Sequence, residues 1–467
     1  MNETSLLKKI CCSLLFVFSF TTLGAASGKF YAVGPSEPVV KYLDEVTSPV
    51  PREVRRVAVE VFFDLIPTTM RFSMPCYPCM VTENGIHFSN GWTETYDPKA
   101  SSSCEILWDN EARTARMWIE SQNPARIVVR WRAAIADPDG RIAHNDIPSG
   151  SPYGKGDWTD EWYYIYPDGT HTRHVRIYTG LAAQSLPVTD ETFGDSQPVR
   201  EIPPSVVHEF QEDFIFGQRG HIPEDDIEVA PVTLIMMDGR SKTISYQPYP
   251  KDFGAFLEAN IKVINLKSNY QPFTIFLPYG VENEPYPPEG ELPHVFQTWR
   301  GGSKSGYSTS LGHTLNWWHF RRTENILEQV YVSGMTKAKD PEEELIPLAQ
   351  SWIRPPQLKG EGLEPKYKVH IYDQTQRAYV LTCGEKGARR FELTLAEAAE
   401  GDEQVFIENP AFVIKKWGNA DAEVTFNGEK LIPGKDCRIG HEASNLVVWL
   451  NRRTREPAGI TIAPIKK

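Results

Sequence analysis

Alternation of apolar and polar residues with a period of two runs through most of this chain. Short segments rich in β-branched and aromatic residues are separated by turn signals, a pattern typical of antiparallel β-strands. Asn-Gly or Asp-Gly pairs, which favour hairpin turns, occur at 84–85, 139–140, 168–169, 238–239 and 427–428. The pattern predicts an all-β protein with strands over residues 115–120, 126–134, 161–166, 171–178, 232–237, 243–246, 329–332, 368–372, 423–426, 445–450 and 460–462.

Helical signals are scarce. Asp340 and Pro341, followed by three glutamates, predict a short helix over residues 341–352. A second helix is expected over residues 394–400. The Pro-Pro pair at 355–356 and the Gly/Lys/Glu-rich stretch 358–366 are typical of a linker. We therefore expect a large antiparallel β-sandwich over residues 28–354 and a smaller C-terminal β-sandwich over residues 367–467. The sequence contains no internal repeat that would indicate a propeller or solenoid.

The first 27 residues have the pattern of an export signal. Lys8 and Lys9 precede an apolar run over residues 10–23, and small residues follow at 24–27. The run is shorter than the roughly 20 apolar residues of a membrane-spanning helix. We therefore expect a signal peptide over residues 1–27, and a secreted or periplasmic protein without a membrane span after cleavage.

The net charge limits the kinds of ligand that the protein can bind, and the cysteines offer candidate disulfides. The chain carries 49 Lys and Arg against 61 Asp and Glu, a net charge of −12, which disfavours nucleic acid as a partner. An anionic ligand would need a local basic pocket. The cysteines beyond residue 27 could form one disulfide among Cys76, Cys79 and Cys104, and a second between Cys383 and Cys437. A redox site or a metal site is the alternative for the first three.

Tyr, His and Arg side chains are most concentrated in the segment from Asp157 to Arg176, which surrounds an Asp-Gly turn signal at 168–169. A two-residue turn there would pair Tyr166 with His171, Tyr164 with Arg173, Tyr163 with His174 and Glu161 with Arg176. One face would then hold Glu161, Tyr163, His174 and Arg176. The other would hold Trp162, Tyr164, Tyr166, His171 and Arg173. Because side chains alternate along strands, one face must meet a core and the other a surface or cleft.

This hairpin has the residue types needed to remove the proton α to a uronate carboxylate. Such chemistry requires a base, an acid near the leaving oxygen and a cation that stabilises the carboxylate. The catalytic candidates are His174, Tyr163 and Tyr166, and the substrate-binding candidates are Arg173, Arg176, Trp162 and His171. The alternative is structural, because cross-strand aromatic pairs also stabilise sheets.

A second candidate region extends from His294 to His319 and has a glycine-rich middle at residues 301–306. Loops that present Trp, Arg and His commonly bind ligands. His313 is a catalytic candidate here, and Arg300 and Trp299 are candidates for binding substrate. The alternative places the tryptophans in the core. The spacing of the glycines does not match a phosphate-binding loop.

Carboxylates offer two further interpretations. The acid and base of a glycosidase could come from Asp157, Asp160 and Glu161, or from Glu209, Glu212 and Asp213. The first group, with Asn145 and Asp146, could instead bind a structural calcium ion. We expect no catalytic metal and no other cofactor. No EF-hand, zinc-protease or serine-hydrolase motif is present in the sequence.

Residues 158–169, together with 299–319 and 424–429, resemble exported β-sandwich proteins of bacterial polysaccharide degradation. Within that group the sequence is most similar to uronate-glycan lyases and ulvan oligosaccharide dehydratases. The resemblance implies a large β-sandwich followed by a small one. It does not identify catalytic residues position by position.

The sequence therefore predicts a secreted carbohydrate-active enzyme that performs β-elimination, as a lyase or dehydratase, on anionic, uronate-containing poly- or oligosaccharides. His174 or His313 would act as base and Tyr163 or Tyr166 as acid. The uronate would be neutralised by Arg173, Arg176 or Arg300, and Trp162 and Trp299 would stack on the glycan. The alternatives are a glycoside hydrolase that uses a carboxylate pair and a non-catalytic glycan-binding protein.

Overall fold

The computed structural model describes residues 29–38, 44–45, 56–73, 77–109, 112–182, 208–218, 220–278, 281–287, 307–316, 321–337, 339–360, 372–385, 387–397 and 404–465. Regular structure in these ranges is almost entirely β, in two large sheets, two five-stranded sheets and one two-stranded sheet. All pairings are antiparallel except that between β24 (Ala378–Thr382) and β27 (Ala411–Lys415). The prediction of an all-β fold is confirmed.

The first large sheet has the strand order β1-β3-β4-β5-β6-β13-β19-β18, with β2, β7 and β8 at its margins. Its strands are β1 (Tyr31–Val33), β2 (Asp44–Glu45), β3 (Arg56–Phe62), β4 (Thr69–Ser73), β5 (Tyr77–Val81), β6 (His87–Ser89), β7 (Trp92–Thr95), β8 (Cys104–Glu105), β13 (His208–Phe216), β18 (Val281–Pro285) and β19 (Ser308–Asn316).

The second large sheet has the order β15-β14-β16-β17-β21-β12-β11-β10-β9, with β20 beside β21. Its strands are β9 (Arg116–Asn123), β10 (Arg126–Ala134), β11 (Trp158–Ile165), β12 (His171–Tyr178), β14 (Ile227–Ile235), β15 (Ser241–Ile244), β16 (Ile261–Leu266), β17 (Gln271–Ile275), β20 (Arg321–Arg322) and β21 (Ile326–Thr336). Side chains of both large sheets meet in two apolar clusters, in one of which Phe72 and Tyr163 pack edge to face with ring centroids 4.8 Å apart.

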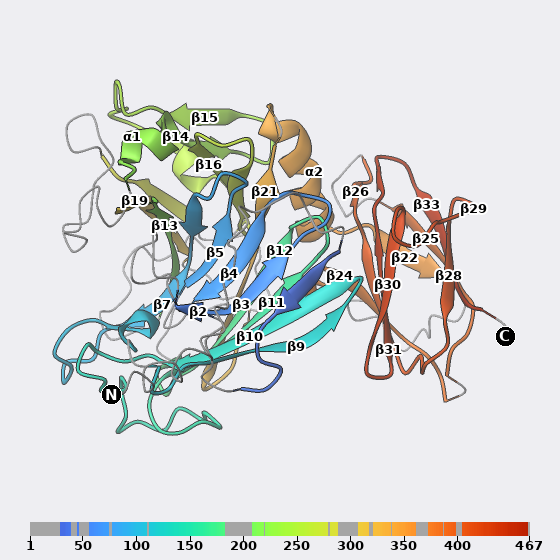
Figure 1. The fold of residues 1–467 in the computed structure, drawn as a ribbon, viewed down its shortest axis with the longest axis horizontal. Coiled ribbons are helices and arrows are strands. Elements are labelled where there is room, and N and C mark those ends of the chain that lie inside the picture. Colours follow the sequence, from blue (N-terminus) through green and yellow to red (C-terminus); the bar gives the residue numbers. More distant parts are fainter. Residues whose placement is uncertain are drawn as a thin grey trace, which may run out of the picture.

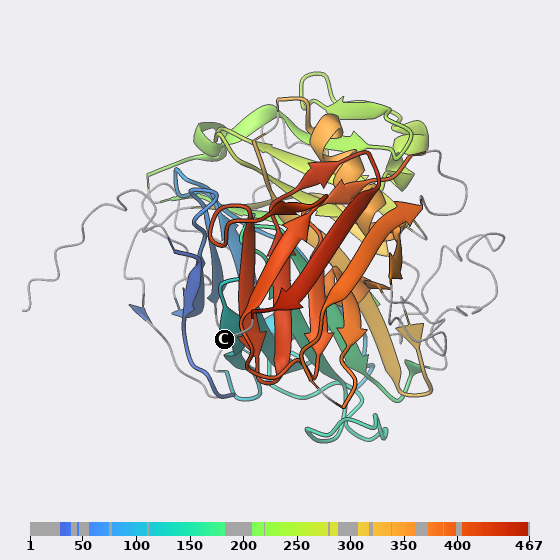
Figure 2. The same cartoon turned by 90° about the vertical axis from the view of Figure 1, so that its right-hand side faces the viewer.

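The C-terminal strands form a second, smaller sandwich beside the large sheets (Figures 1 and 2). One sheet contains β22 (Gln357–Gly360), β25 (Phe391–Glu397), β33 (Ala458–Pro464), β28 (Ala422–Phe426) and β29 (Glu429–Lys430). The other contains β23 (Tyr372–Asp373), β24, β27, β31 (Asn445–Leu450) and β30 (Cys437–Glu442). β26 (Ile407–Glu408) pairs with β32 (Arg453–Thr454). The predicted linker includes β22, which pairs with β25; the domain boundaries stay predictions.

Hydrogen bonds join the small sandwich to the β11–β12 hairpin. The Tyr166 hydroxyl donates to the Gln376 carbonyl at 2.5 Å, and Arg377 donates to the Thr170 hydroxyl at 2.8 Å. Asn409 donates to Asp168 at 2.8 Å. Because Tyr166 is fully buried, these bonds are shielded from water and hold the turn of the hairpin against the C-terminal strands.

Helices cover part of the second sheet. The predicted helix at 341–352 is confirmed as α2 (Pro341–Ile353), whose Leu345, Leu348 and Trp352 pack on strands β16, β17 and β21. Shorter helical segments are α1 (Pro223–Asp226), η2 (Ile106–Trp108), η4 (Gly254–Glu258) and η6 (Gln374–Gln376). The helix predicted at 394–400 is wrong where it is described, because residues 391–395 alternate strictly between buried and exposed in β25.

Cysteine pairing differs from the prediction. Cys79, Cys104, Cys383 and Cys437 are all free and buried, and Cys76 lies outside the described residues. Cys383 follows β24 and Cys437 begins β30, with β27 and β31 between these strands. Three strand spacings amount to about 14 Å, which exceeds the reach of a disulfide. The predicted bridge between Cys383 and Cys437 is therefore wrong.

Candidate functional site: the Trp–Arg face of the second sheet

The β11–β12 hairpin is paired one residue away from the predicted register. Ile165 lies opposite His171, Tyr163 opposite Arg173, and Trp162 opposite His174. The connection is a three-residue loop, closed by bonds from Tyr166 N to Thr170 O and from Gly169 N to Tyr166 O. Gly169 adopts φ +82°, as expected for a type I turn followed by a G1 bulge. An Asp-Gly pair suits this three-residue loop as well as a two-residue turn, so the pair alone does not distinguish the two turn types.

The corrected register gives the hairpin a buried face and a partly exposed face. Tyr163, His171 and Arg173 point into the core, where none is more than 3% exposed. Arg173 forms two bonds to Glu161, Nε to Oε2 at 2.9 Å and Nη2 to Oε1 at 3.0 Å. The Tyr163 hydroxyl also donates to Glu161, at 2.6 Å. Burial and the Glu161 charge raise the pKa of Tyr163 well above its ordinary value. Glu161, Tyr163 and Arg173 thus form a buried hydrogen-bonded network.

Two rows of side chains cross the other face of the hairpin and its neighbouring strands. Strand pairing aligns Trp118, Arg130, Trp162 and His174 in one row and Arg132, Asp160, Arg176 and Glu328 in the next. Directly opposed residues share a face of the sheet. We call these eight residues the Trp–Arg face. It brings together the predicted site residues Trp162, His174 and Arg176.

Planar groups in the first row stack on one another. The Arg130 guanidinium lies 4.6 Å from the Trp162 ring centroid and 5.1 Å from that of Trp118. His174 stacks on Trp162 with the centroids 5.4 Å apart. Such cation–π and ring contacts fix the orientation of long side chains. Because neighbours occupy its faces, Trp162 presents an edge rather than the open face that sugar stacking would need.

Arg130 and Arg176 are more exposed than Asp160 and Glu328, the carboxylates of this face with which they pair. The side chains of Arg130 and Arg176 are 25% and 33% exposed, whereas those of Asp160 and Glu328 are 0% and 8% exposed. Arg130 forms a two-bond pair with Asp160, and Arg176 contacts Glu328 at 2.7 Å. The surface therefore presents guanidinium edges in a protein whose net charge is −12. The face itself holds three arginines and two carboxylates, and Glu120 lies 3.6 Å from Arg130 at its margin.

His174 has an acidic partner beneath it. Its Nε2 lies 3.4 Å from Glu328 Oε2, and His174 itself is 6% exposed. Burial alone would raise the pKa of Glu328, but His174 and Arg176 outweigh it and hold the pKa at about 2. Glu328 therefore carries a negative charge beside the His174 imidazole at neutral pH, although no hydrogen bond joins the two side chains.

Tyr153, which the sequence reasoning did not select, lies beside this face. Its ring lies under Arg132, 4.5 Å from the guanidinium, and its hydroxyl bonds with Arg130 at 3.0 Å and with Asp160. Burial and the Asp160 bond raise the pKa of Tyr153 to about 12. The residue comes from the loop before β11, where no strand pattern indicated its position.

His313, the remaining described catalytic candidate, belongs to the first sheet. It lies opposite Glu212 of β13 and Glu284 of β18, and the Tyr286 hydroxyl is 2.6 Å from its Nε2. It is thus separate from the Trp–Arg face. Tyr166 is held by the C-terminal strands, and Arg300 and Trp299 lie outside the described residues.

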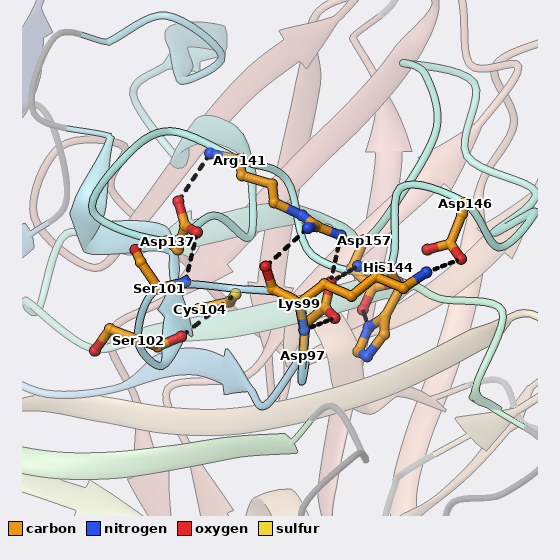
Figure 3. A network of polar contacts seen from close by, with 10 residues as sticks. All are labelled: Asp97, Lys99, Ser101, Ser102, Cys104, Asp137, Arg141, His144, Asp146 and Asp157. Atoms are coloured by element: carbon orange, nitrogen blue, oxygen red, sulfur yellow. Dashed lines mark hydrogen bonds and ion pairs between the residues drawn. The ribbon is translucent and has the colours of Figure 1, made fainter.

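The carboxylates considered as calcium ligands are bound to cations instead. Figure 3 shows His144 against Asp157, with Nδ1 and Oδ2 2.6 Å apart, and Lys99 against Asp146 at 2.5 Å. Burial would lower the pKa of His144, but the bond to Asp157 outweighs it and raises the pKa. Asp160 and Glu161 bind arginines, as described above. In the described ranges, no three His, Cys, Asp or Glu side chains converge as metal ligands would.

Comparisons with known proteins give distant likenesses. No protein-family model matches the sequence, and no curated protein matches it. Galactose 1-epimerase from Lactobacillus acidophilus NCFM is 7% identical, with a TM-score of 0.26 over 60% of this chain and 93% of that one. A polysaccharide lyase is 6% identical with a TM-score of 0.17, over 86% of this chain and 46% of its own. Xanthan lyase from Paenibacillus is 8% identical with a TM-score of 0.26, over 86% of this chain and 38% of its own.

This chain thus spans less than half the length of either lyase. TM-scores this low assign neither a shared fold nor a shared activity. Within the part of the chain that the structure describes, no helix is both long and apolar enough to span a bilayer.

Proposed function

We propose that this protein is an exported carbohydrate-active enzyme that binds uronate-containing poly- or oligosaccharides on its Trp–Arg face and eliminates across them. The observation that carries the proposal is the cross-strand alignment of Arg130, Trp162 and His174 beside Arg176 and Glu328. Base, carboxylate partner and cation lie together on one rigid sheet, as a preorganised site requires.

Recognition on this face would rest on charge and hydrogen bonds. Arg130 and Arg176 use their Nε and Nη2 groups on Asp160 and Glu328, so a uronate carboxylate would bind the remaining guanidinium N–H groups. Their orientation is fixed before a ligand arrives by Asp160 and Glu328, so little side-chain entropy is lost on binding. Because neighbouring side chains cover the indole faces, ring stacking on the glycan should contribute less to binding than the sequence predicted.

Elimination on this face would use His174 as base. His174 takes the proton from the carbon α to the carboxylate, the bond from the β-carbon to its oxygen breaks, and the electron pair forms the carbon–carbon double bond. Arg176 pairs with the carboxylate as charge develops, and Tyr153 supplies the proton that the leaving oxygen takes up. We assign the acid to Tyr153 rather than Tyr163 or Tyr166, because Tyr153 is only partly buried whereas the other two are fully buried. All three hydroxyls donate within the protein, to Asp160, Glu161 and Gln376 respectively.

Non-catalytic glycan binding is the second candidate. It is favoured by the burial of His174 Nε2, which has no hydrogen-bond partner among the described residues and faces Glu328 rather than solvent. Under this alternative the Trp–Arg face would bind the same anionic glycans without turnover.

The test follows the absorbance of unsaturated uronates while the purified mature protein is incubated with uronate glycans and their oligosaccharides. We expect product with the native chain, none with His174→Ala, and undiminished product with the control His221→Ala, whose imidazole pairs with Asp226 elsewhere. Binding without product in the native chain would support the second candidate. New reducing ends without absorbance would refute elimination and support hydrolysis.

A further inference from the structure

The edge of the first sheet holds a second cluster of polar side chains that the Trp–Arg face does not use. His313 of β19 lies between Glu212 of β13 and Glu284 of β18, with nitrogen-to-oxygen distances of 3.5 and 3.8 Å. Tyr286, just beyond β18, places its hydroxyl 2.6 Å from Nε2 and 2.8 Å from Nδ1 of the same imidazole. The His313 side chain is 27% exposed, so a ligand in solvent can reach it.

One oxygen of this cluster is buried and unsatisfied. Glu212 is 4% exposed, and its Oε1 accepts no hydrogen bond from the described residues. A buried carboxylate oxygen without a donor is costly, by about 1–3 kcal/mol or more. A hydroxyl donor supplied from outside would remove that cost. This atom is an independent indication that the cluster is completed by a bound group.

The floor beneath the cluster is rigid. Lys262 of β16 bridges the two sheets by binding Asp213 at 2.7 Å and the Thr314 hydroxyl at 2.5 Å. Thr314 in turn donates to Asn283 of β18 at 2.8 Å. All four side chains are nearly fully buried, and they fix the backbones that carry Glu212 and His313. The cluster is therefore held in place before any ligand binds.

The electrostatics of this edge differ from those of the Trp–Arg face. Burial raises the pKa of Tyr286, and the negative charges of Glu212, Glu284, Asp213 and Glu94 raise it further. Lys262 is already paired with Asp213. A uronate carboxylate would be repelled here. Imidazole and phenol both donate and accept hydrogen bonds, and the carboxylate accepts, which together match the hydroxyls of an uncharged sugar.

We propose that Glu212, His313 and Tyr286 form a second saccharide-binding site, which takes a neutral sugar residue through its hydroxyl groups. Glu212 Oε1 accepts from one hydroxyl, while the His313–Tyr286 pair exchanges hydrogen bonds with a neighbouring one. A neutral polyol can use both the donors and the acceptors of His313 and Tyr286 as well as the carboxylate, whereas an ammonium group could use the acceptors alone. The site does not depend on the elimination proposed for the Trp–Arg face.

The test titrates the full mature chain with glucose, galactose, xylose and rhamnose, and separately with glucuronate, while NMR follows the histidine imidazole signals. We expect at least one neutral sugar to shift the His313 signals and glucuronate to leave them unchanged. Tyr286→Phe, which removes one hydroxyl, and Glu212→Gln should each weaken that binding about tenfold, the loss of one hydrogen bond. His221→Ala is the matched control and should bind normally.

Two results would overturn the proposal: no neutral sugar moves the His313 signals, or Tyr286→Phe and Glu212→Gln both bind as the native chain does. A larger shift of the His313 signals with glucuronate than with every neutral sugar would also overturn it. Since Arg176→Gln should weaken uronate binding on the Trp–Arg face and leave neutral-sugar binding intact, failure of one site is distinguishable from failure of the other.

Discussion

Replacing Arg173 with methionine tests whether the inner face of the hairpin is structural. Arg173 is 3% exposed and Glu161 is 0% exposed, and two hydrogen bonds of 2.9 and 3.0 Å join them. Arg173→Met keeps most of the side-chain volume but leaves the Glu161 carboxylate buried without its cation. The Tyr163 hydroxyl remains as a partner at 2.6 Å, which compensates only in part.

Breaking a buried ion pair by removing one partner costs about 3–5 kcal/mol. Because the Tyr163 bond survives, we expect the lower end of that range. If the large sandwich unfolds as one unit of roughly 330 residues, its unfolding entropy near 60 °C is about 0.7 kcal/mol/K, so a loss of about 3 kcal/mol should lower the melting temperature by about 4 °C. Arg173→Met/Glu161→Gln, which removes both charges, should recover at least half of the lost stability.

Urea unfolding and calorimetry on the native, single and double variants would measure these differences, with uronate binding recorded in parallel. A loss below about 1 kcal/mol for Arg173→Met would refute the buried pair, since surface ion pairs contribute that little. Loss of uronate binding at undiminished stability would place Arg173 in contact with ligand, contrary to its position on the inner face of the hairpin.

Three further predictions concern other parts of the molecule. Arg176→Gln should weaken uronate binding at least tenfold and reduce its sensitivity to added salt, measured by calorimetry over a range of sodium chloride; unchanged affinity would exclude the Trp–Arg face. The pKa of Glu328 is lowered from 4.5 to about 2, so its stabilising contribution is complete above pH 4.5 and is lost as the pH falls toward 2. Unfolding free energies of the native chain and Glu328→Gln should therefore converge over that interval, and parallel curves would contradict the assignment. Burial raises the pKa of Cys79 and of Cys104 to about 12, so mass spectrometry should find both unalkylated at pH 8 until denaturant is added.

Much of the fold could be predicted because the strands alternate cleanly. The strands at 126–134, 171–178 and 445–450 match β10, β12 and β31 residue for residue. The helix α2 was also found, since Asp340 at the N-cap position and Pro341 after it marked its start, although the Asp340 side chain makes no capping bond. The segment at 394–400 failed because its composition suits a helix, whereas pairing with β33 makes residues 391–397 a strand.

The candidate site was only partly predictable, because proximity between distant strands is not encoded locally. Sequence reasoning found Trp162, His174 and Arg176, and it placed His174 on the wrong face relative to Trp162. Arg130 and Tyr153 were missed, since only sheet order brings β10 and the loop before β11 beside them. The alternation of apolar and polar residues shows which residues of one strand share a face. The length of the connecting loop decides which face of the next strand lies on the same side of the sheet.

Pro167, the first residue of the three-residue loop, therefore carries more information than its position in a turn suggests. In a two-residue turn at 168–169, residue 167 would have to donate its backbone N–H across the hairpin to residue 170, and proline has no N–H to give. In the observed loop Pro167 takes the first central position of a type I turn, which its fixed φ favours. A relative with another residue at 167 could close the shorter turn and shift β12 by one position against β11, so that His171 and Arg173 exchanged sides with His174 and Arg176. Among relatives of this chain, the residue before the Asp-Gly pair would then mark a change of specificity without any substitution on the face itself.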